Sequence, residues 1–98
     1  MNANVFGSKI TIKFDSTLDA QGFKGIYFAD KKLILLEKTL TPSHKLQTLI
    51  HEMIHSIISR IGIDQTKMSH DLEEILCESI AITLVENWKL LKKVSSPD

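Results

Sequence analysis

The segment from His51 to His55 reads His-Glu-Met-Ile-His and carries the residue types best suited to chemistry in this chain. On a helix, two imidazoles four residues apart lie one turn apart on the same face and can bind one Zn²⁺ from the same side. Glu52 lies beside them, where it can take a proton from a metal-activated water without being a ligand. The spacing therefore predicts a zinc site in which Glu52 is the general base.

Two other interpretations of this motif are weaker. A chance match without metal is disfavoured because the motif falls on a segment with strong helical periodicity. A purely structural zinc is disfavoured because such a site has little need for Glu52.

The residues around the motif predict one long amphipathic helix. Thr41 is a suitable N-cap, Pro42 is tolerated at the first helical position, and Gly62 suits the C-terminal end. At about 100° per residue, His51 and His55 lie roughly 110–150° from the centre of the apolar stripe. We therefore expect the histidines to point away from the core. The stripe consists of Leu46, Leu49, Ile50, Met53, Ile54, Ile57, Ile58 and Ile61.

Zinc catalysis needs a third protein ligand and one open position for water. We favour Glu74 as this ligand because it lies in the first turn of the next helix, at the mouth of the cleft between the helices. Glu78, one turn deeper, would be a buried carboxylate, and we expect it to hydrogen-bond His51 or His55 instead. Glu73 is expected to interact only with the helix dipole. The candidates weighed are Glu73, Glu74, Glu78, His70 and Asp71.

The second helix is predicted over residues 72–91, and Ser69 or Asp71 can cap its N-terminus. This segment is apolar over most of its circumference, which predicts packing on more than one side. Residues 94–98 are expected to form a frayed tail.

The first 40 residues predict a small sheet of about three strands. Ile10, Ile12 and Phe14 alternate with polar residues, as in a half-buried strand. Residues 26–36 are typical of a hairpin with a turn near Asp30. The predicted fold class is therefore α+β, with the sheet followed by the motif helix and a C-terminal glutamate helix, in a single domain over residues 1–98.

Composition excludes several classes of function. The chain has 98 residues with 12 basic and 12 acidic side chains, so its zero net charge argues against binding nucleic acid or anionic lipid by general electrostatics. The single cysteine, Cys77, excludes an internal disulfide or a Cys-rich zinc module. No signal peptide or membrane-spanning segment is recognisable, so we expect a cytoplasmic protein.

Four segments together resemble the gluzincin zinc metallopeptidases, especially minigluzincins and the small phage-type proteins related to the ImmA/IrrE group. The resemblance implies an active-site helix followed by a glutamate helix that supplies the third ligand, with an acid four residues later supporting a histidine. Glu74 and Glu78 match that pattern, although the Asn that precedes the glutamate in larger members is absent. The run Glu78-Ser79-Ile80-Ala81 would instead make Glu78 the ligand. The segments are residues 25–27, 33–37, 46–55 and 72–76.

Two other zinc-peptidase groups fit less well. Metzincins continue the motif with a glycine and a third histidine, but Ile58 and Ile61 occupy those positions. SprT-like proteases carry a third histidine beyond a loop, as His70 does, but their glycines around it are absent, since Ser69 and Asp71 flank it.

The sequence thus predicts a zinc-dependent endopeptidase with one Zn²⁺ on His51, His55 and Glu74, acting on a peptide or protein substrate. The alternative is a catalytically silent or latent zinc-binding module with a zincin-like scaffold that acts in protein–protein interaction or regulation. A chain this short has no lower subdomain to form the other wall of a cleft, so a substrate would be held mainly by a sheet edge, which is an argument for this alternative.

Overall fold

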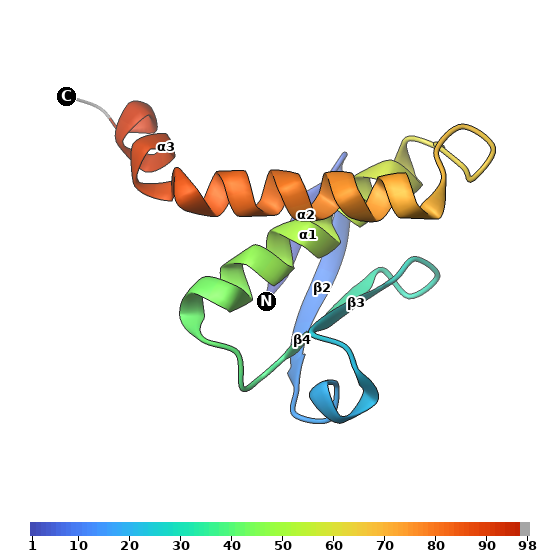
Figure 1. The fold of residues 1–98 in the computed structure, drawn as a ribbon, viewed down its shortest axis with the longest axis horizontal. Coiled ribbons are helices and arrows are strands. Elements are labelled where there is room, and N and C mark those ends of the chain that lie inside the picture. The colour runs from blue at the N-terminus through green and yellow to red at the C-terminus, as the bar shows by residue number, and fades with distance from the viewer. Residues whose placement is uncertain (97–98) are drawn as a thin grey trace.

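The computed structural model describes residues 1–96 and has an α+β fold, as predicted (Figure 1). A four-stranded mixed sheet packs against α1, and α2 crosses the opposite side of α1. The elements are β1 (Asn2–Val5), β2 (Ser8–Asp15), a 3-10 turn (Asp19–Gln21), β3 (Gly25–Phe28), β4 (Leu33–Glu37), α1 (Pro42–Arg60), α2 (His70–Glu86) and α3 (Trp88–Ser95).

The sheet has the strand order β1-β2-β4-β3. β4 pairs in parallel with β2 and antiparallel with β3, which confirms the predicted hairpin. The sequence analysis predicted about three strands and missed β1, because its alternation of polar and apolar residues spans only four positions and includes one large apolar side chain, Val5. A tight turn joins β1 to β2 through Phe6 and Gly7, which both have positive φ values, 47° and 77°.

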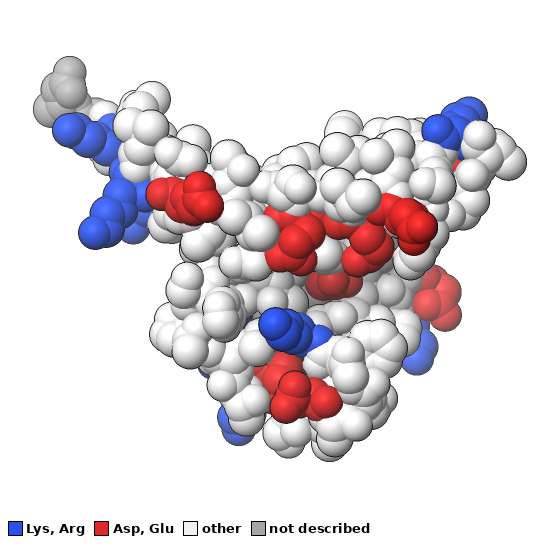
Figure 2. All heavy atoms as spheres, viewed as in Figure 1, with Lys and Arg blue, Asp and Glu red and all other residues white. Residues whose placement is uncertain are grey.

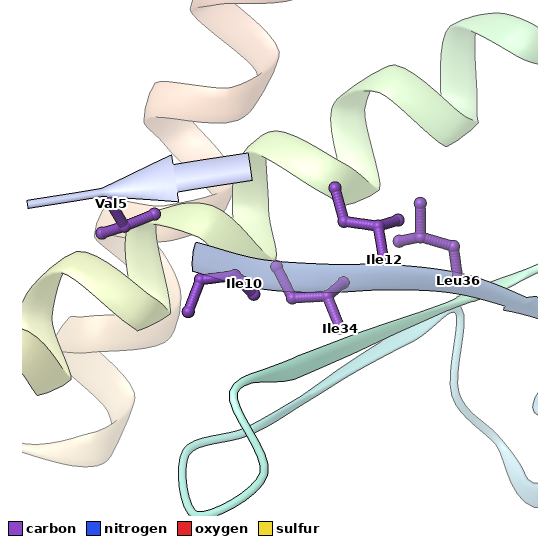
Figure 3. Close-up of a cluster of buried hydrophobic side chains, with 5 residues drawn as sticks. All are labelled: Val5, Ile10, Ile12, Ile34 and Leu36. Atoms are coloured by element: carbon purple, nitrogen blue, oxygen red, sulfur yellow. The ribbon is translucent and has the colours of Figure 1, made fainter. Parts of the chain in front are cut away.

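The core lies between the sheet and α1. Side chains from β1, β2 and β4 gather there (Figure 3), and Leu49, Met53 and Ile57 of α1 pack against them. Ile10 and Ile34 have no exposed surface, so the alternating positions on the two parallel strands form the centre of this core. The cluster consists of Val5, Ile10, Ile12, Ile34 and Leu36.

The ends of α1 follow the sequence prediction. Thr41 Oγ1 accepts a hydrogen bond from the backbone N–H of His44 at 3.2 Å, and Pro42 occupies the first turn. The helix ends at Arg60, and Gly62 follows with a φ of 80°, a left-handed conformation that glycine adopts without steric cost.

The predicted second helix is divided into two. Ser69 caps α2 by accepting from the Leu72 N–H at 3.1 Å, but α2 ends at Glu86 instead of continuing to residue 91. Asn87 leaves the helical conformation, and its side chain donates to the carbonyl of Thr83 at 2.8 Å. Such a side-chain bond competes with the helical backbone, so α3 leaves the axis of α2 (Figure 1).

The prediction of a frayed tail over residues 94–98 is wrong for residues 94 and 95, which belong to α3. Residues 97 and 98 lie outside the described part of the chain.

Within residues 1–96, no helix combines the length and apolar content that a membrane crossing requires.

Candidate metal centre

The helix α1 separates its apolar residues from its histidines, as its sequence pattern predicts. Leu49, Met53 and Ile57 face the sheet, whereas His51 and His55 contact glutamates of α2. The imidazoles therefore lie between the two helices, each with about one seventh of its side chain exposed (13% and 14%).

Three side chains bring ligand atoms to one point. The Nε2 atoms of His51 and His55 are 3.1 Å apart. Glu74 Oε1 lies 2.6 Å from His55 Nε2, and Glu74 Oε2 lies 3.4 Å from His51 Nε2. A tetrahedral zinc with bonds of about 2.0–2.1 Å separates its ligand atoms by about 3.3 Å. The three side chains are therefore placed close to the spacing that such an ion requires.

The outer nitrogen of each imidazole contacts a second carboxylate. His51 Nδ1 lies 2.9 Å from Glu78 Oε2, and His55 Nδ1 lies 2.5 Å from Glu73 Oε2. Because an ionised carboxylate only accepts hydrogen bonds, each Nδ1 donates to its carboxylate, and Nε2 is the nitrogen that faces Glu74 and the other histidine. With both imidazoles neutral, the two Nε2 lone pairs and the Glu74 carboxylate form a set of acceptors that a bound cation would satisfy.

Glu78 contacts a histidine as predicted, but its side chain is 48% exposed, so the prediction of a buried carboxylate is wrong. Its Oε2 accepts from His51, and its Oε1 accepts from Gln47 Nε2 at 2.7 Å. This second bond ties the carboxylate to α1, one turn before His51, and restricts the rotation of both side chains.

Glu73 differs from the expectation that it interacts only with the helix dipole. Its side chain is 16% exposed and contacts His55. Glu73 and Glu74 are successive on α2, about 100° apart, so they reach different nitrogens of the same imidazole. Both glutamates were candidates for the third zinc ligand in the sequence analysis. Which nitrogen of His55 each one contacts depends on how α2 crosses α1, and this cannot be read from the sequence.

Glu52 is buried, with 8% of its surface exposed, and its Oε2 lies 3.9 Å from His51 Nε2. Ligand atoms of His51, Glu52 and His55 all lie within 4.8 Å of one another. Burial raises the pKa of the Glu52 carboxyl above its ordinary value, while the nearby His55 and His51 and a hydrogen bond from the Tyr27 backbone oppose this rise. The carboxylate thus lies beside the convergence point, in a partly dry environment.

Gly25 permits the close approach of β3 to α1 beside the motif. A Cβ atom at this position would lie 2.7 Å from Thr48 Cγ2 and 3.2 Å from Glu52 Cγ. The sequence analysis did not predict this role of Gly25, because the requirement comes from a helix distant in the sequence.

Replacing Gly25 with alanine is expected to destabilise the fold by about 1–3 kcal/mol, because the added methyl group overpacks the contact with Thr48. Urea unfolding monitored by circular dichroism measures the change. The double variant Gly25→Ala/Thr48→Ala removes the closer contact and should recover much of the loss, relative to Thr48→Ala alone. An unchanged urea midpoint in Gly25→Ala would show that the strand does not need glycine here.

A cleft of about 560 Å³ lies between β3 and the two helices. Ile26 and Tyr27 line it from the strand side, and His51, Glu52 and Glu74 line it from the helices. Figure 2 shows acidic side chains gathered in this hollow, beneath the helix that crosses the upper part of the view.

Within residues 1–96, the other two candidates for the third ligand form no hydrogen bond or ion pair with His51 or His55. His70 lines the cleft but is exposed, and within residues 1–96 neither of its ring nitrogens hydrogen-bonds another side chain. Asp71 is exposed and does not line the cleft. The arrangement therefore favours Glu74 over both.

Comparison of the chain with protein-family models, curated proteins and solved structures finds no match. The gluzincin resemblance stays a prediction from sequence motifs. The function is therefore inferred from the residues of the site.

Proposed function

We propose that this chain is a zinc-dependent endopeptidase. The observation that carries the proposal is the convergence of His51 Nε2, His55 Nε2 and the Glu74 carboxylate beside the buried Glu52. His51, His55 and Glu74 would hold one Zn²⁺, and their donor atoms, two imidazoles and one carboxylate, form a set found in catalytic zinc sites.

When bound, Zn²⁺ polarises a carbonyl as a Lewis acid and lowers the pKa of a bound water to about 7. Glu52 takes the proton of the attacking water and returns it to the leaving amine. Its position 3.9 Å from His51 Nε2 lets it act beside the metal ligands. Glu73 and Glu78 keep the imidazoles in the tautomer that directs Nε2 toward the metal.

The sheet edge supports a peptide as the substrate. β3 is the last strand of the sheet, so within the described residues its outer N–H and C=O groups have no strand partner. An extended peptide can add to such an edge through main-chain hydrogen bonds. Ile26 and Tyr27 of this strand line the same cleft as His51 and Glu52, so the added peptide would pass the site.

We also propose a cytoplasmic location. The support is the single cysteine, Cys77, which is buried as a free thiol. Burial and neighbouring carboxylates raise the pKa of this thiol to about 12, so it is not a reactive thiolate.

Metal removal tests the function. The zinc-loaded chain is expected to cleave members of a broad peptide library, and the products are identified by mass spectrometry. Dialysis against a chelator should abolish cleavage, and one equivalent of Zn²⁺ should restore it. Restored cleavage would show that the chelator removed the metal without unfolding the chain irreversibly. Circular dichroism of the metal-free chain checks its folding independently.

The same screen separates the peptidase from a latent or silent module. Stoichiometric zinc binding without turnover of any library member would contradict the peptidase and favour a binding role. The absence of zinc binding would contradict both functions.

A further inference from the structure

The helix α2 has an inverted distribution of polar and apolar residues. The side that packs on α1 carries Glu73, Glu74 and Glu78, which contact the histidines. The opposite side is apolar and exposed, with Ile75 exposed at 61%. We call this side the outer face; it consists of Leu72, Ile75, Leu76, Ile80 and Ile82.

The short helix α3, which follows α2 after Asn87, carries further exposed apolar side chains. Its lysines lie on one side, and its apolar side chains form a stripe on the other. The stripe consists of Trp88, Leu90, Leu91 and Val94, all at least 40% exposed. Figure 2 shows the basic groups of this end of the molecule at the left, and uncharged atoms along the upper edge over α2.

We propose that the outer face and the α3 stripe form the interface of a homodimer, in which the α2–α3 segments of two copies pack antiparallel about a two-fold axis. From their exposed fractions, the nine residues expose roughly 900 Å², and a standard protein interface buries about 800 Å² per partner. Apolar patches of this size are rare on monomers. The surface available therefore matches what a stable dimer needs.

The charge distribution along the α2–α3 segment favours the antiparallel orientation of the two copies. Every acidic residue of the α2–α3 segment precedes Asn87 and every lysine follows it. Antiparallel pairing places the lysines of one copy at the end of the other copy's α2 that carries the exposed Asp71, whereas parallel pairing would place the lysines of the two copies together. Glu73, Glu74 and Glu78 contact the histidines on the opposite side of α2 and add no contact across this interface.

The middle of the outer face permits the α2 helices of two copies to approach each other closely. Ser79 and Thr83 lie there, one turn apart, and a shallow hollow of about 230 Å³ is lined by these two residues with Ile80 and Leu84. Small side chains near the two-fold axis let the two helices come together, and the hollow can receive an apolar side chain of the partner. Pairing does not depend on zinc, because no metal-site residue belongs to the outer face.

Analytical ultracentrifugation of the 98-residue chain tests the dimer. The wild type should sediment as a dimer at micromolar concentrations. Ile75→Glu/Ile82→Glu should raise the dissociation constant at least about 100-fold, because two charges would be buried at the interface. Both side chains are exposed in one copy, so circular dichroism should be unchanged. The matched control is Phe6→Glu, an exposed aromatic residue in the β1–β2 turn, which should stay dimeric.

A second variant tests the orientation without altering apolar residues. Lys92→Glu/Lys93→Glu should weaken the dimer about 10-fold at low salt, and less at high salt. An unchanged dissociation constant in this variant would overturn the antiparallel arrangement, even if the isoleucine variant fails to fold.

Three results would overturn the proposed interface. The first is a wild type that stays monomeric, and the second is an Ile75→Glu/Ile82→Glu variant that folds and stays dimeric. The third is a monomer that co-sediments with phosphatidylcholine/phosphatidylserine vesicles and loses this binding in the isoleucine variant, which would make the face a lipid-binding surface.

Discussion

Replacing Glu52 with glutamine is expected to lower the rate of peptide hydrolysis by about 10²–10⁴-fold while leaving zinc bound. Glutamine keeps the shape of the buried side chain but cannot accept the proton of the attacking water. The Nε2 atoms of His51 and His55 and the Glu74 carboxylate are untouched, so the metal should stay stoichiometric. Initial rates on a library-derived peptide, with zinc measured by elemental analysis, give both quantities.

The matched control for this experiment is Glu86→Gln, which makes the same chemical change at the exposed C-terminal end of α2. It should keep wild-type activity. Full activity in Glu52→Gln would remove Glu52 from the mechanism, and loss of zinc in that variant would make Glu52 a ligand instead of a base.

Zinc affinity is expected to separate Glu74 from Glu78. Glu74→Ala removes a carboxylate that lies 2.6 Å from His55 Nε2 and 3.4 Å from His51 Nε2, so it should lose a direct ligand. Glu78→Ala removes the hydrogen-bond partner of His51 Nδ1 and of Gln47 but no metal ligand. Loss of such a supporting residue typically weakens metal binding by about 10–100-fold. Competitive titration with a chromophoric chelator under matched conditions should show a much larger loss for Glu74→Ala.

Glu73→Ala is the matched partner of Glu78→Ala in this titration. It removes the acid that contacts His55 Nδ1 and should also weaken zinc binding by about 10–100-fold. If Glu78→Ala loses the metal while Glu74→Ala retains it, the assignment is inverted, and the run from Glu78 to Ala81 marks the true ligand.

The elements that the sequence predicted well are those with strong local signals. α1 combines a capping Thr41, Pro42 and a long apolar stripe, so its start and the direction of its histidines follow from residues close in the chain. The β3–β4 hairpin is likewise marked by two apolar runs around a short turn. Such local periodicity identifies helices and strands without knowledge of the tertiary structure.

The parts that sequence inspection missed depend on contacts between distant residues. β1 alternates polar and apolar residues over only four positions, which is too short a signal to identify a strand without its partner β2. The role of Glu73 depends on how α2 crosses α1, and the role of Gly25 depends on Thr48. The apolar residues of α2 were predicted to pack on several sides, but much of this surface is exposed in one copy.

The most direct test of the proposed site is a crystal structure of the zinc-loaded chain with anomalous scattering data collected at the zinc edge. The expected result is one peak at about 2.0–2.2 Å from His51 Nε2, His55 Nε2 and a Glu74 oxygen, with Glu78 still bonded to His51 Nδ1. A peak coordinated by Glu78 or His70 in place of Glu74, or no peak between the histidines, would contradict the proposed site.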